Sequence, residues 1–397
     1  MPIPTKIFHV DVDCAQLSKF GRQVCGDVFL SRKIKEEERT IVVVSDGLGS
    51  GVKANVLATL TASMAVNFTL EKQPIDRTAR IIMQTLPVDS LRQISYATFT
   101  IADIECGGDT RIIEFDNPGW ILVRNGLPLD VPKQMLCIDL EDGKTRKMFL
   151  SHFKLQMDDR IVIVSDGVTQ SGIGTAQMPF GFGDDAYRQF VCSYLTSNSS
   201  VSAHDLARSV VRKSCANDVY KPQDDITCAV IHFRSPRRLL ICSGPPFDES
   251  KDRQLAEIAQ SFDGKKIICG GTTSIIIARE LGIKINVGLT IDSSGLPPAS
   301  QMDGVDLVTE GILTIGRVAE MLEQLHGTEV QGSGPAVSIV KLMLESDVIN
   351  LLVGTKINIA HQDPSLPVEL EIRRNVMRKI TRLLEEKFLK EVNVQFI

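Results

Sequence analysis

Hydrophobic and polar positions follow two different patterns in the two parts of the chain. In the first part, apolar residues recur at helical spacing over residues 51–70 and 75–86, and two more helices are expected near 185–196 and 202–216. Short β-branched or alternating runs predict strands at residues 8–17, 26–33, 39–47, 95–105, 110–117, 120–126, 159–167 and 224–233. Strand runs with helices grouped between them favour two packed sheets flanked by helices.

The pattern changes after Arg234-Ser-Pro-Arg-Arg238, a charged segment with a proline that is typical of a linker. Strand-like and helical runs then alternate, and this alternation predicts a mainly parallel sheet with right-handed crossovers. A long helix is expected over residues 367–391. We therefore expect two domains, at 1–235 and 239–397, because 397 residues exceed what one hydrophobic core usually organises.

Composition and charge narrow the classes of function. Lys and Arg number 44 against 49 Asp and Glu, and these charges are scattered instead of forming a basic stripe, so we expect no nucleic-acid partner. We expect no membrane span, because no uncharged apolar run reaches the required length of about 20 residues. The nine cysteines form no CxxC pair and lie mostly in apolar runs, which favours a cytoplasmic protein with reduced thiols.

Acidic residues stand where four predicted strands begin or end. Asp27 opens one strand, Asp46 and Asp166 each close a strand in the repeated phrase [IV]-V-S-D-G, and Asp224-Asp225 opens the last strand of the first domain. We expect the glycine of each phrase to turn the chain and to leave its carbonyl free for a metal. Taken singly, an Asp-Gly after a strand is more often only a turn, but the four together indicate a catalytic site.

Four aspartates without a histidine or thiolate in the pattern describe a site of hard oxygen ligands. Such a site suits Mg²⁺ or Mn²⁺ better than Zn²⁺. Two ions roughly 3.5–4 Å apart can activate a water and stabilise an in-line phosphoryl displacement. The sequence therefore predicts hydrolysis of a phosphate ester without a covalent intermediate.

The same residues resemble the type 2C metal-dependent protein phosphatases, in the bacterial branch similar to sporulation stage II protein E. The resemblance spans about residues 5–235 and is carried by Gly26-Asp27, VSDGLGSG at 44–51, VSDGVTQSG at 164–172 and DDIT at 224–227. It implies an α-β-β-α sandwich and a protein substrate phosphorylated on serine or threonine in bacterial signalling. It also implies a set of metal-site residues, namely Asp27, a bridging Asp46, the Gly47 carbonyl, Asp166, Asp224 and, as a support of Asp224, Asp225.

Three positions bear on how closely the family pattern is kept. Leu48 stands where eukaryotic members often have a histidine that protonates the leaving serine, so water would serve here. Gln170 stands where many relatives have an acidic residue, which puts a third metal in doubt. Arg22 has the spacing from Asp27 of a phosphate-binding arginine, although a solvated arginine at a strand edge accounts for it equally well. The helices at 51–70 and 75–86 match helices implicated in switching the activity of relatives, or they simply cover a sheet.

Other phosphatase and nucleotide chemistries fit the sequence poorly. The spacing from Cys228 to Arg234 is that of a cysteine phosphatase, but the segment is an apolar strand without glycine. Neither GxxxxGK[ST] nor GxGxxG occurs, which argues against a nucleotide-driven kinase or a dinucleotide enzyme.

The second domain is not identified by any resemblance. In it, a strand-to-helix junction is a candidate anion site, formed by Gly270, Gly271, Thr272, Thr273 and Ser274. An ordinary turn with a capped helix is the alternative. We expect a regulatory, ligand-sensing or dimerising module with a small-molecule effector, and a homodimer is compatible with the sequence.

Two functions from different classes follow. One is a Mn²⁺- or Mg²⁺-dependent serine/threonine phosphatase, with hydrolysis of a phosphorylated metabolite as a variant. The other is a catalytically weak pseudophosphatase that senses a small anion through residues 239–397.

Overall fold

The computed structural model describes residues 8–71, 77, 81–82, 97–139, 145–287, 297–325, 330–356 and 367–397. These residues form two compact units, Phe8–Ser235 and Pro236–Ile397, and each unit is described by itself. Within the described ranges, none of the helices combines the length and the apolar composition that a membrane span requires.

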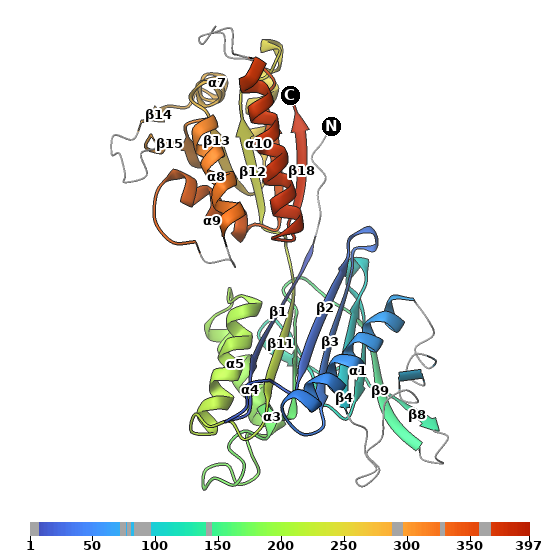
Figure 1. Ribbon diagram of the computed structural model, residues 1–397. Helices are drawn as coiled ribbons and strands as arrows, with labels where there is room; N and C mark the ends of the chain where they lie inside the picture. Colours follow the sequence, from blue (N-terminus) through green and yellow to red (C-terminus); the bar gives the residue numbers. More distant parts are fainter. Residues whose placement is uncertain are drawn as a thin grey trace. The chain divides into compact units, whose positions relative to one another are not determined.

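Two antiparallel sheets form the centre of the first unit (Figure 1). The six-stranded sheet has the order β2 (Val28–Ile34), β3 (Arg39–Gly47), β4 (Ala97–Ile104), β5 (Asp109–Phe115), β9 (Thr145–Lys154) and β8 (Gln134–Asp139). The five-stranded sheet has the order β1 (His9–Leu17), β11 (Ile226–Arg234), β10 (Arg160–Val164), β6 (Ile121–Arg124) and β7 (Leu127–Leu129). Short 3₁₀ helices lie at Lys35–Glu37 and Cys106–Gly108.

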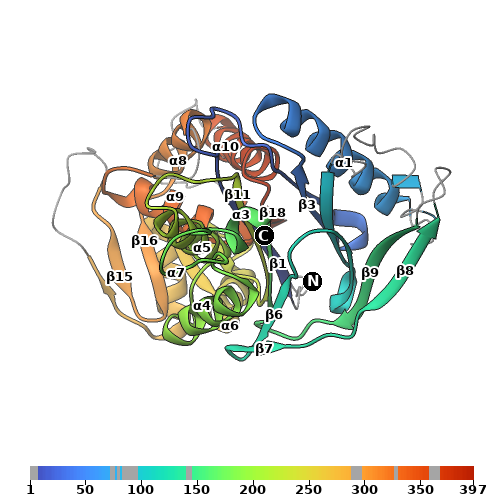
Figure 2. The ribbon, with the colours of Figure 1, turned by 90° about the horizontal axis from the view of Figure 1, so that it is seen from below.

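Helices cover the two outer faces of this pair of sheets. Helix α1 (Val52–Leu70) packs on β2, β3 and β4, whereas α5 (Ala203–Asn217) packs on β1 and β11, with α4 (Asp184–Ser197) beside it. Figures 1 and 2 show α1 along one outer face of the unit, and α4 and α5 along the other. The predicted four-layer α-β-β-α sandwich is therefore confirmed for this unit.

The buried strand β3 shows why these layers form. Its residues Ile41 and Val43 pack in one cluster with Ala62 of α1. Val42 and Val44 point to the opposite face and pack in the cluster between the two sheets. Because both faces of β3 are covered, its sequence reads as a continuous apolar run instead of an alternating one.

Three strands of the first unit were not predicted from the sequence. They are β7, β8 and β9, which lie at or next to sheet edges and expose large side chains such as Met135 and Phe149. β7 is three residues long and contains a proline, β8 exposes most of its residues, and polar and basic residues interrupt the apolar pattern of β9, so the period of two is weak. The helix predicted over 75–86 lies largely outside the described residues. Within that range, residues 77 and 81–82 are described, and they are helical.

The second unit contains one seven-stranded sheet, which is mainly parallel as predicted. Its order is β14 (Ile285–Asn286), β15 (Ser300–Met302), β16 (Val305–Thr309), β13 (Lys265–Cys269), β12 (Arg238–Ser243), β17 (Val348–Val353) and β18 (Glu391–Phe396). The last five strands in this order are parallel to one another, and β14 and β15 are antiparallel additions at the edge.

Helices lie on both faces of this sheet. A 3₁₀ turn (Glu249–Lys251) leads into α6 (Asp252–Ser261), which packs with α7 (Gly271–Leu281) on one face. The opposite face is covered by α8 (Ile312–Gln324), α9 (Pro335–Glu345) and α10 (Pro367–Glu386). The helix predicted to reach residue 391 ends at Glu386, and the alternating run EVNVQF forms β18 beside β17 instead.

Candidate metal centre

Four aspartates from separate segments meet at one rim of the two sheets in the first unit. Asp27 directly precedes β2, and Asp46 is the penultimate residue of β3. Asp166 follows β10 and begins the one-turn helix α3 (Asp166–Thr169), and Asp224 stands two residues before β11. Asp46, Asp166 and Asp224 line one cavity of about 290 Å³, and Asp27 interacts with Asp46 directly. The structure thus brings together the four carboxylates, and their role as metal ligands stays a prediction.

Burial and mutual repulsion act on these carboxylates together. Burial raises the pKa of Asp27, which is 2% exposed, to about 7. Burial also raises the pKa of Asp46 well above its usual range, and the negative charges of Asp27, Asp166 and Asp224 raise it further. The pKa of Asp224 is raised chiefly by burial as well. Negative charge gathered in this way is stabilised by a bound cation.

Two of these carboxylates, Asp166 and Asp224, accept hydrogen bonds from neighbouring residues. Gln170 Nε2 donates to Asp166 Oδ2 at 2.8 Å, and the Asp225 amide donates to Asp224 Oδ1 at 2.9 Å. Lys19 Nζ lies 3.9 Å from the same oxygen of Asp224. In the part of the chain that the structure describes, no group of three or more His, Cys, Asp or Glu side chains is already arranged to hold a metal ion.

The chemistry of the donors nevertheless fits hard divalent cations. Carboxylate and carbonyl oxygens are the preferred ligands of Mg²⁺ and are also suited to Mn²⁺. Among the described residues that line the cavity, none is a histidine or a cysteine. Gly47, whose carbonyl was predicted to be a ligand, is one of the lining residues.

The glycines beside the aspartates are required for a different reason than predicted. A Cβ on Gly47 would lie 2.2 Å from the Ala54 carbonyl oxygen, and a Cβ on Gly167 would lie 2.1 Å from the carbonyl oxygen of Asp225. Neither glycine adopts a positive φ. Each is therefore present because another backbone passes close by, and the expected turn conformation is not the reason.

Asp225 acts on the loop that leads to Asp27. Its Oδ1 accepts a hydrogen bond from the Lys19 amide and its Oδ2 accepts one from the Gly26 amide, both at 2.9 Å. The side chain is 3% exposed. We expected it to support Asp224, and its backbone amide does donate to Asp224, whereas its two carboxylate oxygens bond to the Lys19 and Gly26 amides in the segment that leads to Asp27.

Three residues that hold Asp27 and Asp225 were missed by the sequence analysis. Thr227 Oγ1 donates to Asp27 Oδ2 at 2.6 Å, and Gln16 Nε2 donates to Thr227 Oγ1 at 3.1 Å and to the Asp27 carbonyl at 3.2 Å. Ser165 Oγ accepts from the Thr227 amide at 3.0 Å. Thr227 belongs to the DDIT segment and Ser165 to the VSDG phrase, so both motifs contained a signal, whereas Gln16 had none.

Two further residues line the same cavity. Leu48 lines it, and so does Asp116, a fifth carboxylate that the sequence analysis did not single out. Burial raises the pKa of Asp116. Arg22 is exposed, and its Cδ lies 3.9 Å from the position that a Cβ on Gly51 would occupy. Within the described residues, the Arg22 guanidinium has no ion-pair partner.

The candidate anion site of the second unit lies where β13 ends and α7 begins. The Gly270 amide donates to the Thr309 carbonyl at 2.8 Å, and Ser274 Oγ donates to the Gly271 carbonyl at 2.8 Å. Thr273 and Ser274 are buried, whereas Gly271 and Thr272 are exposed. The hydroxyls of Thr273 and Ser274 therefore face the protein, and anion binding at this junction stays a prediction.

Several solved structures are similar to this chain at low identity. The phosphatase domain of SpoIIE from Bacillus subtilis is 13% identical, with a TM-score of 0.44, over 57% of this chain and 93% of that chain. RsbX in complex with magnesium is 18% identical, with a TM-score of 0.40, over 57% and 96% of the two chains. The catalytic domain of the phosphatase PstP in complex with two manganese ions is 13% identical, with a TM-score of 0.40, over 57% and 100%.

No curated protein matches the chain. A family match, in contrast, covers half of it: the sequence model described as "Stage II sporulation protein E (SpoIIE)" matches residues 36–234. That range contains Asp46, Asp166 and Asp224 and all of the sandwich except β1, β2 and the segment with Asp27, in agreement with the resemblance noted from the motifs. The chain belongs to the SpoIIE family of metal-dependent serine/threonine phosphatases.

Proposed function

We propose that the unit Phe8–Ser235 is a protein serine/threonine phosphatase that removes phosphate from a phosphoprotein in bacterial signalling. The observation that carries the proposal is the meeting of four carboxylates, from four separate segments, beside one cavity. Membership of a phosphatase family supports a phosphorylated protein as the substrate.

The proposed ligands are Asp27, Asp46, Asp166, Asp224 and the Gly47 carbonyl. Asp46 is the carboxylate on which the charges of the other three all act, and it would hold the ions together with them. When bound, two Mn²⁺ or Mg²⁺ ions supply an activated water and compensate the charge of the phosphoryl oxygens during an in-line displacement.

Two further residues would act on a substrate. The exposed Arg22 guanidinium has the planar fork that suits a phosphate group. Leu48 lines the cavity and has no proton to give, so the leaving serine oxygen would take its proton from water. Water is consumed, and the products are the free hydroxyl side chain and inorganic phosphate.

The test removes one negative charge from the site while keeping the shape of the side chain. Asp46→Asn and Asp166→Asn should each lower the Mn²⁺-dependent hydrolysis of p-nitrophenyl phosphate and of a phosphoserine peptide by about 10- to 100-fold or more. Calorimetric titration with Mn²⁺ should show weaker binding in both variants. Asp139→Asn is a matched control, because Asp139 is exposed at the end of β8 and is not part of the cavity.

Full turnover in both active-site variants would disprove the proposal. Turnover of phosphorylated metabolites but not of phosphopeptides would keep the metal chemistry and change the substrate class.

One contact favours the alternative of a pseudophosphatase. Gln170 Nε2 donates a hydrogen bond to Asp166 Oδ2 at 2.8 Å, and Gln170 stands where many relatives have an acidic residue. A pseudophosphatase would bind Mn²⁺ weakly and would show no turnover with any divalent ion, so the same titration separates the two functions.

For the second unit, Pro236–Ile397, we propose a regulatory or ligand-sensing role. Its parallel strands have the spatial order β16-β13-β12-β17-β18. Along the chain, β13 and β16 are added on one side of β12, and β17 and β18 are then added on its other side. Sheets of this kind bind ligands beyond the carboxyl ends of their strands, which is also the side of the Gly270–Ser274 junction.

A further inference from the structure

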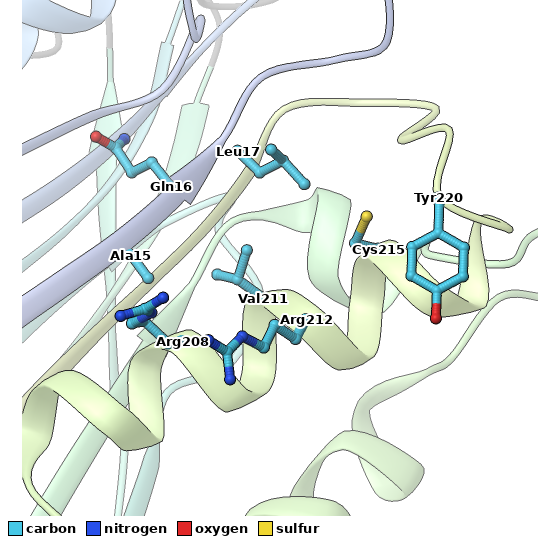
Figure 3. A pocket seen from close by; sticks show the side chains of 8 residues that line it. All are labelled: Ala15, Gln16, Leu17, Arg208, Val211, Arg212, Cys215 and Tyr220. Carbon is cyan, nitrogen blue, oxygen red and sulfur yellow. The ribbon is translucent and has the colours of Figure 1, made fainter.

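A second cavity of the first unit lies between the end of β1 and helix α5 (Figure 3). Its volume is about 430 Å³, which falls within the range of roughly 300–1,000 Å³ that is usual for small-molecule sites. Leu17 of β1 and Val211 of α5 form apolar walls, and Tyr220 lies beside the end of α5, as Figure 3 shows. The cavity is distinct from the aspartate cavity, with which it shares no lining residue.

Two arginines bring uncompensated positive charge to this apolar cavity. Arg208 and Arg212 are one turn apart on α5, and both line the cavity. Arg208 Nη1 is 3.4 Å from His204 Nε2, and neither arginine has an ion-pair partner within the described ranges. The nearby carboxylate of Asp13 contacts His204 Nδ1 at 3.3 Å. Like charges four residues apart on a helix repel each other, so this arrangement favours binding of an anion.

The turn after α5 holds apolar side chains exposed next to the cavity. Val219 and Tyr220 both have positive φ angles, 53° and 61°, which cost about 1–2 kcal/mol for each residue. Asp218 enforces the turn, because its carboxylate accepts hydrogen bonds from the amides of Gly172 at 2.6 Å and Gln223 at 3.0 Å. Tyr220 remains 75% exposed in spite of this strain. Strained backbone that presents an exposed aromatic ring is typical of a binding site.

We propose that this cavity binds a small amphipathic anion, with its apolar body against Leu17, Val211 and Tyr220 and its carboxylate between Arg208 and Arg212. The two guanidinium groups would make charge-assisted hydrogen bonds to the carboxylate. The volume and the mixture of apolar walls with two cations favour a single-chain carboxylate of moderate length over a fully polar ligand.

The position of the cavity links it to the metal centre. Leu17 and Gln16 of β1 both line the cavity, and Gln16 Nε2 donates to Thr227 Oγ1 and to the carbonyl of Asp27. A ligand that displaces the end of β1 therefore acts on the segment that holds Asp27. This consequence rests on the proposed function, whereas binding of the anion does not.

The binding test uses 1-anilinonaphthalene-8-sulfonate, a fluorescent amphipathic anion, with the full-length chain. We expect saturable binding that decanoate displaces and that the uncharged decanol does not. The double variant Arg208→Ala/Arg212→Ala should bind the probe about tenfold more weakly, because both charge-assisted contacts are lost. Arg32→Ala/Arg188→Ala removes the same charge from exposed or partly exposed positions outside the cavity, and this control should bind as the wild type does.

Circular dichroism shows whether each variant is folded, and Arg212→Gln alone replaces the double variant if that chain unfolds. Equal affinity of the wild type and the arginine variants would overturn the proposal, as would displacement of the probe by decanol as well as by decanoate.

The link between this cavity and the metal centre is tested by Mn²⁺ titration with and without saturating decanoate. A change in Mn²⁺ affinity that is lost in Gln16→Ala, while this variant still binds the probe, supports the link, and an unchanged affinity overturns it while the binding result stands.

Discussion

Replacement of Thr227 by valine tests how the position of Asp27 is fixed. The hydroxyl of Thr227 donates to Asp27 Oδ2 at 2.6 Å, and both side chains are buried. Valine keeps the shape of threonine and removes only the hydroxyl group. The carboxylate of Asp27 then loses a charge-assisted hydrogen bond in a place where water does not replace it, and Gln16 Nε2 loses an acceptor at 3.1 Å.

The expected magnitude follows from these contacts. A hydrogen bond to a charged group contributes about 1.5–3 kcal/mol, and loss of a partner that orients a metal ligand typically lowers metal affinity by about 10- to 100-fold. We therefore expect Thr227→Val to weaken Mn²⁺ binding by about 10- to 100-fold in a calorimetric titration. Turnover at saturating Mn²⁺ should be affected less than Mn²⁺ affinity, because the four carboxylates themselves remain.

Two controls make this test specific. Thr227→Ser keeps the hydroxyl and should bind Mn²⁺ nearly as the wild type does. Thr110→Val removes another buried hydroxyl, which donates to the Gly108 carbonyl at 2.9 Å, and should lower the free energy of unfolding without a change in Mn²⁺ affinity. Wild-type Mn²⁺ affinity in Thr227→Val would refute the reasoning that this hydrogen bond positions Asp27 for the metal.

Three further predictions concern stability. Gly47→Ala should lower the free energy of unfolding by about 1–3 kcal/mol in urea titration, because the added Cβ would meet the Ala54 carbonyl at 2.2 Å; an unchanged midpoint would contradict this. Mn²⁺ at 100 times its dissociation constant should stabilise the protein by about 2.7 kcal/mol and raise the melting temperature in calorimetry, and Asp46→Asn should lose most of this effect. Arg39→Met should cost about 3–5 kcal/mol in urea titration, because it removes the buried partner of Asp103, 2.7 Å away; a neutral result would show that Arg111 alone compensates Asp103.

The sequence predicted most of the fold because the central strands are buried on both faces. Runs such as IVVV in β3 and IVIV in β10 are apolar throughout, so they are recognised without knowledge of their neighbours. Strands at or next to a sheet edge have no such signature: β9 has polar or basic residues at six of its ten positions, and its pairing with β5 and β8 depends on distant parts of the chain. The end of α10 was misjudged because the charged residues before β18 continue a helical composition.

The carboxylates of the candidate site were predictable because each stands at a strand end, and strand ends of neighbouring strands meet at one rim. The residues that orient them were not predictable in the same way. Gln16 lies 211 positions from Thr227, and only the antiparallel pairing of β1 with β11 makes them neighbours. Hydrogen bonds of this kind depend on register, and one residue of slip would turn Gln16 to the other face of its sheet.

The repeated phrase S-D-G gains a physical meaning only when the neighbouring strands are known. Ser45 Oγ donates to the Thr98 carbonyl at 3.0 Å. Ser165 Oγ accepts from the Thr227 amide at 3.0 Å and donates to the Asp225 carbonyl at 3.4 Å, so each serine bonds to the backbone of a neighbouring segment close to the end of its own strand. The aspartate that follows faces the cavity, and the glycine after it lets a second backbone pass within van der Waals distance. Three consecutive residues thus have three separate roles. The serine bonds to neighbouring backbone near the end of the strand, the aspartate supplies a carboxylate, and the glycine leaves room for the close approach of another segment. Because the same roles arise in both sheets, the same three residues occur in both, and in both the serine hydroxyl donates to a backbone carbonyl of a neighbouring segment.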